Sequence, residues 1–268
     1  MVGIAVAGVA GRMGGAIVRA VDLNPGAALV GGFEGPGHPA VGRRMSEVTG
    51  CAQAAGLVSE GPAEVLAKAD VLVEFTTPAA SLANLQDCAK FKKAAVIGTT
   101  GLDAAQKKEM VKLAKKVPVV FAPNMSVGMN LMFKLAGMIT KVLGPEYALE
   151  LVEAHHDQKK DAPSGSAVRL LEEMAIARGL KLDKALRHGR QGLVGARTKD
   201  EIGVSVIRGG DIVGDHTVYF IGQGERIELT HRAHSRETFA QGAVRAALWV
   251  VKQKPGLYDM QDVLGLKG

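Results

Sequence analysis

Histidines, lysines and small residues crowd one stretch of the sequence, EAHHDQKKDAPSGSA at 153–167. Imidazole titrates near neutral pH and lysine carries a positive charge, so these residue types suit proton transfer beside an anion. Neighbouring side chains of a strand point to opposite faces, so His155 and His156 can meet one ligand only where a strand ends. The loop-forming residues that follow predict such an end, and they place Lys159 close to both histidines.

The same stretch predicts the start of a helix after the loop. Pro163 suits a first helical turn. Ser164, Gly165 and Ser166 would leave free N–H groups at that helix start, where a carboxylate binds well. Together these residues predict an anion-binding pocket with two possible proton donors.

Two other interpretations stay open at this point. His155 and His156, with Asp157, could begin a metal site, but no further ligand has a fitting spacing, and we expect no metal. The stretch could also be a strand end and a capped helix of purely structural use. Two histidines and two lysines without nearby compensation would be costly to keep for packing alone. We therefore favour the anion pocket.

A second candidate site is GVAGRMG at 8–14, which follows a predicted strand and opens a predicted helix. Its pattern is G-x-x-G-x-x-G, with Ala10 where the dinucleotide-binding fingerprint has its second glycine. Gly8 permits a tight turn, and Gly14 lets helix and strand pack closely. The helix N-terminus offers N–H donors to a pyrophosphate, and Arg12 can add a full charge. The alternative is a tight turn that binds no ligand.

Glu34 ends the next predicted strand, 20 residues after Gly14. An acid at this position accepts hydrogen bonds from a ribose 2′-hydroxyl and repels a 2′-phosphate. The sequence therefore favours NADH as the cofactor. Arg43 and Arg44 could still reach a 2′-phosphate, although we expect them on a solvated loop.

GTTG at 98–101 and APNMS at 122–126 fall at the C-terminal ends of predicted parallel strands, where open α/β sheets bind ligands. Thr99, Thr100 and Asn124 can hydrogen-bond a nicotinamide carboxamide or its ribose. The same residue types are common in turns and caps, so each one alone is an ambiguous signal.

The elements that position these residues follow an α/β pattern in the first half of the chain. Strands rich in Val, Ala and Ile without polar alternation are buried on both faces, and helices separate them. This pattern predicts a Rossmann-like, doubly wound parallel sheet. We expect strands over 3–8, 27–34, 70–78, 94–100 and 118–124, and helices over 12–24, 81–91 and 103–116.

After about residue 126 the pattern becomes α+β, with a sheet that can present an open face. The last two predicted strands are joined by a short Gly-containing turn, which is typical of a hairpin. A final helix most economically packs back on the first domain. We expect strands over 147–156, 201–208, 216–222 and 225–231, and helices over 126–144, 164–178 and 238–253.

The composition argues against several other classes of protein. The chain has 268 residues, of which 47% are apolar and 22% charged, as in ordinary globular enzymes. No apolar run approaches the roughly 20 residues of a membrane span. The formal net charge is +6, but only 4% of residues are aromatic and no basic stretch is interleaved with them, so we expect no nucleic acid. Cys51 and Cys88 lack zinc spacing, which favours a reduced, cytoplasmic setting.

The chain resembles the dihydrodipicolinate reductase family through several motifs in the expected order. The opening stretch fits E-A-H-H-x-x-K-x-D-A-P-S-G-[ST]-A, and GVAGRMG, GTTG, NMSVGMN, RGGDIVGDHTVYF and GAVRAALW accompany it along nearly the whole chain. The resemblance implies a dinucleotide-binding domain, 1–126 with 236–268, completed by the C-terminal helix. It also implies a substrate domain, 127–235, whose open mixed sheet assembles a homotetramer.

The resemblance further implies the reaction, which is the reduction of 4-hydroxy-tetrahydrodipicolinate to tetrahydrodipicolinate by NADH or NADPH. This step belongs to lysine and diaminopimelate biosynthesis. The nicotinamide would give a hydride to ring C4, and His155, as general acid or base, and Lys159 would supply the proton. The resemblance assigns the substrate carboxylate to His156, Lys159, Gly165 and Ser166.

The nucleotide contacts implied by the resemblance come from four segments. These are the glycine-rich loop, the end of the second strand, GTT and APNM. Their residues are Gly8, Val9, Ala10, Gly11, Arg12, Met13, Glu34, Gly98, Thr99, Thr100, Ala122, Pro123, Asn124 and Met125.

Three positions depart from the common family pattern. Ser166 replaces the more usual threonine and keeps the hydroxyl. Gly35 and Thr77 stand where some members carry an arginine that suits cofactor phosphate, so we expect NADH or dual use rather than NADPH alone. A different nucleotide-dependent oxidoreductase and a non-catalytic nucleotide sensor are the alternatives, but neither needs the residues 153–166 in this form.

Overall fold

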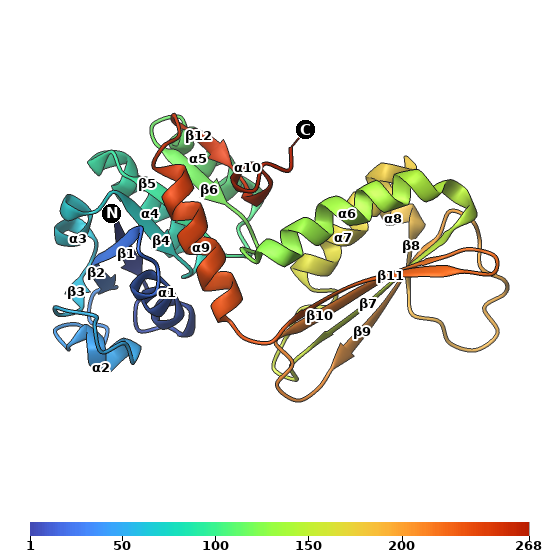
Figure 1. The fold of residues 1–268 in the computed structure, drawn as a ribbon, viewed down its shortest axis with the longest axis horizontal. Coiled ribbons are helices and arrows are strands. Elements are labelled where there is room, and N and C mark those ends of the chain that lie inside the picture. The colour runs from blue at the N-terminus through green and yellow to red at the C-terminus, as the bar shows by residue number, and fades with distance from the viewer. Residues whose placement is uncertain (268) are drawn as a thin grey trace. The chain divides into compact units, whose positions relative to one another are not determined.

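The chain forms two compact units in the computed structural model, which describes residues 1–267 (Figure 1). The first unit comprises Met1–Val127 and the segment from Arg236 onward, and the second comprises Gly128–Ser235. The C-terminal helix α9 (Glu237–Val250) therefore belongs to the same unit as the glycine-rich loop.

The first unit is built on a parallel sheet with the strand order β12-β6-β5-β4-β1-β2-β3. The order reverses between β1 and β4, and open α/β sheets bind ligands beyond the carboxyl ends of the strands at such a point. The predicted Rossmann-like, doubly wound parallel sheet is confirmed. The strands are β1 (Val2–Ala7), β2 (Ala27–Glu34), β3 (Ser59–Glu60), β4 (Val71–Glu74), β5 (Ala94–Ile97), β6 (Pro118–Phe121) and β12 (Gly256–Tyr258).

Helices cover both faces of this sheet, because its strands are apolar at successive positions. In β1, Ile4 and Val6 pack with helices α1 and α9 on one face. Ala5 and Ala7 point to the other face and pack with α3, α4 and α5. The helices are α1 (Arg12–Asp22), α2 (Met45–Thr49), α3 (Ala63–Lys68), α4 (Pro78–Phe91), α5 (Ala104–Ala114), α9 and α10 (Met260–Val263).

One boundary in this unit differs from the prediction. The strand expected over 70–78 ends at Glu74, and Pro78 instead opens α4. The Thr77 hydroxyl accepts a hydrogen bond from the Ala80 N–H, so Thr77 caps the helix and Pro78 takes a position where a missing N–H costs nothing. The short elements β3, β12, α2, α3 and α10 were not predicted, because they hold too few residues to show a periodicity.

The second unit has a mixed sheet with the order β11-β10-β7-β9-β8. Strand β10 runs antiparallel to β11 and β7, while β9 runs parallel to β7 and β8. The predicted mixed sheet and the β10–β11 hairpin are confirmed. The elements are α6 (Val127–Leu143), η1 (Gly144–Glu146), β7 (Ala148–His155), α7 (Gly165–Arg178), α8 (Leu182–Ala185), β8 (Leu186–His188), β9 (Ile202–Arg208), β10 (Gly214–Ile221) and β11 (Arg226–Ala233).

The core of the second unit lies on one face of its sheet. Leu149 and Leu151 of β7 pack there with α6 and α7, together with Val204 and Val218 from the neighbouring strands. Since strand side chains alternate, the residues between them point to the opposite face. The two long helices α6 and α7 pack on the same face of the sheet. Among the described residues of this unit, no helix packs on the other face.

Replacing Gly242 of α9 by alanine is expected to destabilise the first unit. A Cβ at this position would overlap the carbonyl oxygen of Met125, and backbone atoms cannot easily give way. Overpacking of this kind costs about 1–3 kcal/mol of the free energy of unfolding, which thermal denaturation would show as a lower Tm.

Gly137→Ala in α6 is the matched control, because a Cβ there would make an ordinary 3.6 Å contact with Glu173. Alanine favours a helix over glycine by about 1 kcal/mol, so this variant should be neutral or more stable. Equal losses of Tm in the two variants would contradict the close approach of α9 to Met125.

Candidate active site

The glycine-rich loop joins β1 to α1 and is shaped for a close ligand. Gly8 adopts φ +66°, which favours glycine, and a Cβ at Gly14 would overlap the Gly8 carbonyl and lie 2.7 Å from the Val9 Cα. Gly11 is the N-cap of α1 and supplies no side-chain acceptor, so the first N–H groups of the helix stay open to a ligand. Such an uncapped N-terminus suits a pyrophosphate.

Glu34 holds the loop from the end of β2. Its Oε1 atom accepts a hydrogen bond of 2.7 Å from the Ala10 N–H. The carboxylate is partly exposed, and within the described residues its second oxygen has no recorded protein partner. Glu34 can therefore support the loop and still accept from a ribose hydroxyl. Arg43 and Arg44 are exposed, and Arg44 precedes α2 as its N-cap.

The GTT and APNM segments follow β5 and β6 at the same carboxyl edge of the sheet. Thr100 and Pro123 are exposed there, Asn124 is half-buried, and Ala122 and Met125 are buried. A Cβ at Gly98 would overlap the ring of Phe75, so this position also requires a glycine. All the predicted nucleotide residues lie at the carboxyl ends of β1, β2, β5 and β6, or in the loops and the first turn of α1 that follow them.

Thr99 differs from the prediction of a side chain free to bind a ligand. Its hydroxyl lies 2.9 Å from Glu74 Oε2 and accepts a 2.7 Å hydrogen bond from the Thr76 N–H. Glu74 is buried and also accepts from the Ser81 and Thr76 hydroxyls. Burial raises the pKa of Glu74 despite these hydrogen bonds. Thr99 therefore supports the loop after β4, with its hydroxyl already bonded to Glu74 and Thr76.

In the second unit, β7 ends at His155, as the opening stretch predicts. His155 is buried, and its Nδ1 atom lies 2.6 Å from Oε2 of Glu153. Glu153 also accepts hydrogen bonds of 2.9 Å from both terminal nitrogens of Arg208 and from the Ser164 N–H. Burial alone would raise the pKa of Glu153, but the hydrogen bonds from His155, Arg208 and Ser164 lower it to about 2.

A third histidine faces this cluster from β10. His216 is paired in register with Glu153, and its ring meets the ring of His155 edge-on with centroids 5.2 Å apart. Its Nε2 atom lies 3.1 Å from the Ser164 hydroxyl. Burial and the nearby His155 lower the pKa of His216 to about 3, so its ring is neutral at neutral pH.

The loop after β7 carries the predicted cation. Lys159 is partly buried and forms a 2.8 Å ion pair with Asp161. Burial would raise the pKa of Asp161, but the hydrogen bond and charge of Lys159 lower it. His156 is half-exposed, and its backbone N–H donates to the Ile212 carbonyl.

Two expectations about the start of α7 were wrong. Pro163 lies before the N-cap Ser164 rather than in the first turn. The Ser164 N–H is not free, because it donates to Glu153, and the Ser164 hydroxyl accepts from the Ala167 N–H at 3.2 Å. The Gly165 N–H follows at the same helix start, and no described protein atom is recorded as its acceptor. It is therefore a backbone donor that can bind a carboxylate.

The two units match the two halves of one known family. The sequence profile described as dihydrodipicolinate reductase, N-terminus, matches residues 2–125. The profile described as dihydrodipicolinate reductase, C-terminus, matches residues 128–264. The chain belongs to the dihydrodipicolinate reductase family.

Individual members of the dihydrodipicolinate reductase family agree with this assignment. The 4-hydroxy-tetrahydrodipicolinate reductase of Geotalea uraniireducens is 54% identical over 267 residues, with 100% of both chains covered. The one from Geotalea daltonii is 52% identical with the same coverage. A dipicolinate-bound dihydrodipicolinate reductase from Paenisporosarcina sp. TG-14 is 27% identical, with a TM-score of 0.75 and 98% of each chain covered.

Membership of the dihydrodipicolinate reductase family confirms the function predicted from the sequence. The chain is an oxidoreductase of lysine and diaminopimelate biosynthesis that uses a nicotinamide dinucleotide. None of the helices in residues 1–267 is long and apolar enough to cross a membrane. The same residues contain no group of three or more His, Cys, Asp or Glu side chains that could hold a metal ion.

Three buried polar residues of this reductase, and the half-buried Arg208, were not predicted as part of either site. Glu153 stood within the quoted motif, and its spacing of two from His155 on a strand puts both side chains on one face, which was a usable signal. His216 and Arg208 belong to the RGGDIVGDHTVYF motif, but nothing local shows that they meet His155. Glu74 is the last residue of the otherwise apolar strand β4, and a buried acid is itself an indication of function.

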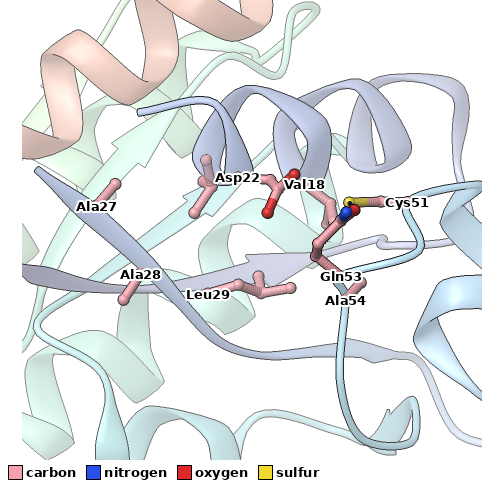
Figure 2. A pocket seen from close by; sticks show the side chains of 9 residues that line it. Val18, Asp22, Ala27, Ala28, Leu29, Cys51, Gln53 and Ala54 are labelled. Carbon is pink, nitrogen blue, oxygen red and sulfur yellow. Dashed lines mark hydrogen bonds between the residues drawn. The ribbon is translucent and has the colours of Figure 1, made fainter. Parts of the chain in front are cut away.

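A cavity of about 160 Å³ lies in the first unit, away from its glycine-rich loop (Figure 2). It is formed by the last turns of α1, the first residues of β2 and the segment after α2. That places it at the edge of the sheet opposite to the carboxyl ends of the strands, and none of the predicted site residues lines it. The lining residues are Val18, Val21, Asp22, Ala27, Ala28, Leu29, Cys51, Gln53 and Ala54.

Proposed function

We propose that this chain reduces 4-hydroxy-tetrahydrodipicolinate to tetrahydrodipicolinate, with His155 as the general acid. The observation that carries the proposal is the fixed imidazole of His155 at the end of β7, beside the lysine-bearing loop and the start of α7. The dipicolinate bound to the Paenisporosarcina relative is itself a small dicarboxylate, which supports this substrate class.

In this proposal the substrate carboxylate binds between the loop and α7. His156, Lys159, Gly165 and Ser166 are the residues that hold it. Lys159 is paired with Asp161 in the free chain, so the substrate replaces one carboxylate by another and leaves no lysine charge uncompensated. The Gly165 N–H adds a donor at the positive end of α7.

The proton comes from His155, and Lys159 stabilises the charge that develops. When bound, the nicotinamide supplies the hydride that enters ring C4. Overall, one hydride and one proton are taken up and the 4-hydroxyl leaves as water. His155 suits the proton transfer because its imidazole carries an exchangeable proton and the Glu153 carboxylate holds the ring in place. A cationic Lys159 lowers the energy of the electron-rich intermediate state of the ring.

The first unit has residues that fit the nicotinamide dinucleotide. The space that a Cβ at Gly14 would fill and the uncapped start of α1 suit the pyrophosphate, with Arg12 as the added charge. The outer oxygen of Glu34 suits a ribose hydroxyl. We therefore propose residues 1–126 with 236–268 as the dinucleotide-binding domain and residues 127–235 as the substrate and oligomerisation domain.

The kcat/KM for NADH is expected to equal or exceed that for NADPH. Glu34 would repel a 2′-phosphate, and Gly35 and Thr77 provide no positive charge to offset that repulsion. The comparison needs substrate made in situ from pyruvate and aspartate semialdehyde by a synthase, with the absorbance of each reduced cofactor followed separately. A preference for NADPH of about tenfold would contradict this expectation. Cofactor oxidation without the synthase would contradict the proposed substrate.

We also propose that the open face of the second sheet assembles a homotetramer. That face carries Ile207 and Ile221, which are 51% and 39% exposed, beside the half-buried Tyr219. Apolar side chains on an unpaired sheet face are typical of an interface. A mass of four chains by light scattering supports the proposal, and a monomer at assay concentration overturns it.

Cys51 and Cys88 are both free and buried, which suits a cytoplasmic setting.

A further inference from the structure

Strand β7 breaks its own apolar pattern next to the proposed proton donor. Leu149, Leu151, Glu153 and His155 alternate onto the same face of the sheet, where the first two belong to the core. Glu153 is 1% exposed, so a carboxylate occupies a position where the pattern calls for an aliphatic side chain. A buried charge is destabilising unless it is paired and hydrogen-bonded, which suggests that Glu153 has a function besides packing.

The carboxylate of Glu153 is fully engaged in hydrogen bonds. Oε1 accepts from Arg208 Nη2 and from the Ser164 N–H, both at 2.9 Å. Oε2 accepts from Arg208 Nη1 at 2.9 Å and meets His155 Nδ1 at 2.6 Å. Arg208 also donates to the Asp161 carbonyl at 2.7 Å, so the pair ties the end of β7 to the following loop. The bidentate arginine fixes the plane of the carboxylate.

We propose that Glu153, oriented by Arg208, is a positioning residue for the reduction: it keeps the proton of His155 on Nδ1 and makes Nε2 the atom that exchanges a proton with substrate. This inference rests on the proposed function only in taking His155 as the proton donor. An ionised carboxylate can only accept, so the Nδ1 atom that faces it must carry hydrogen. The same negative charge stabilises the ring when both of its nitrogens are protonated.

The surroundings of the other nitrogen fit this assignment. A Cβ at Gly214 would lie 3.0 Å from Nε2 of His155, so glycine keeps that side of the ring open. His216 meets the ring edge-on and is neutral, because burial and the nearby His155 lower its pKa to about 3. A charged His155 therefore has the Glu153 carboxylate within hydrogen-bonding distance and the neutral ring of His216 at its edge.

The alternative is that Glu153 and Arg208 have only a structural function and hold the loop after β7 against the sheet. Glu150 offers a matched control for that role. It lies on the same strand but on the opposite face, and it binds Arg190 and Arg197 through comparable ion pairs without touching a histidine. Breaking either ion pair should weaken local packing. Only the loss of the Glu153 carboxylate should change the tautomer of His155.

The test compares Glu153→Gln with Glu150→Gln in the full chain. An amide places a donor where the carboxylate accepts, so nitrogen-edited NMR of histidine-labelled free protein should show His155 shifting from the Nδ1–H to the Nε2–H form. We expect kcat to fall by about 10²-fold in Glu153→Gln, with KM for the cofactor unchanged. Glu150→Gln should keep both the His155 tautomer and kcat.

A double variant separates positioning from structure. If Glu153 acts through His155, then Glu153→Gln should add no loss of kcat in a His155→Gln background. An additive loss, or an unchanged tautomer in Glu153→Gln, overturns the proposal. If His155→Gln alone keeps the wild-type kcat, the proposed function of His155 is wrong. The NMR result still decides which tautomer His155 adopts. If Glu153→Gln does not fold, the same spectrum of the unchanged chain decides the assignment: the Nδ1–H form of His155 supports the proposal, and the Nε2–H form overturns it.

Discussion

Replacing His155 by glutamine is expected to lower kcat by about 10²–10⁴-fold, the usual contribution of a general acid. Glutamine has a similar reach and can hydrogen-bond Glu153, but it cannot carry and release a proton near neutral pH. The cofactor should bind almost normally, because its proposed residues belong to the first unit and His155 to the second. Steady-state kcat and a fluorescence titration with NADH would measure both quantities.

His188→Gln serves as the control for this substitution. His188 is an exposed histidine at the end of β8, outside the cluster around Glu153, and its loss should leave kcat unchanged. Near-normal turnover in His155→Gln would show that the proton donor has been assigned to the wrong residue.

Replacing Lys159 by alanine is expected to lower kcat/KM for the substrate by about 10²–10³-fold, through both kcat and KM. The ammonium group is proposed to hold a substrate carboxylate and to stabilise charge during reduction, so its removal weakens binding and turnover together. It also leaves Asp161 without its 2.8 Å partner, which adds repulsion toward an anionic substrate. Initial rates over a range of substrate concentrations separate the two constants.

The adjacent Lys160 provides the matched control for Lys159→Ala. Lys160 is exposed and forms none of the ion pairs seen around the site, so Lys160→Ala removes the same charge one residue away. Similar losses in the two variants would mean that general attraction of an anion, and not a defined contact by Lys159, explains the effect.

The fold could be predicted largely because its strands and long helices carry strong patterns. The apolar residues of β1, β4, β5 and β6 indicate a sheet buried on both faces, and the helices between them require parallel strands. The ends of helices and strands were harder to predict where the local sequence favours two different structures. Pro78 follows an apolar run and looked like a strand end, yet it is a favoured first residue of a helix once Thr77 caps it.

The candidate site was less predictable, because its contacts depend on strand pairing. Arg208 is 55 residues from Glu153 in sequence, and it reaches the carboxylate only because β9 lies parallel beside β7 with His155 opposite Arg208. His216 enters from the other side through the antiparallel pairing of β10 with β7. No local periodicity encodes that register. The local sequence therefore held a signal for Glu153 but none for the Arg208 and His216 side chains that meet it.

Glu34 accepts a hydrogen bond from the Ala10 N–H in the loop, and its other oxygen is the one proposed above to bind the ribose. A mutation at Glu34 would loosen the glycine-rich turn at the same moment that it changes the charge. Gly35 has no such double task, since a Cβ there would meet no atom within 4 Å. A basic side chain at position 35 would have room to extend without disturbing the hydrogen bond from Ala10 to Glu34. A change of coenzyme preference during evolution should therefore disturb the loop less through a substitution at Gly35 than through one at Glu34.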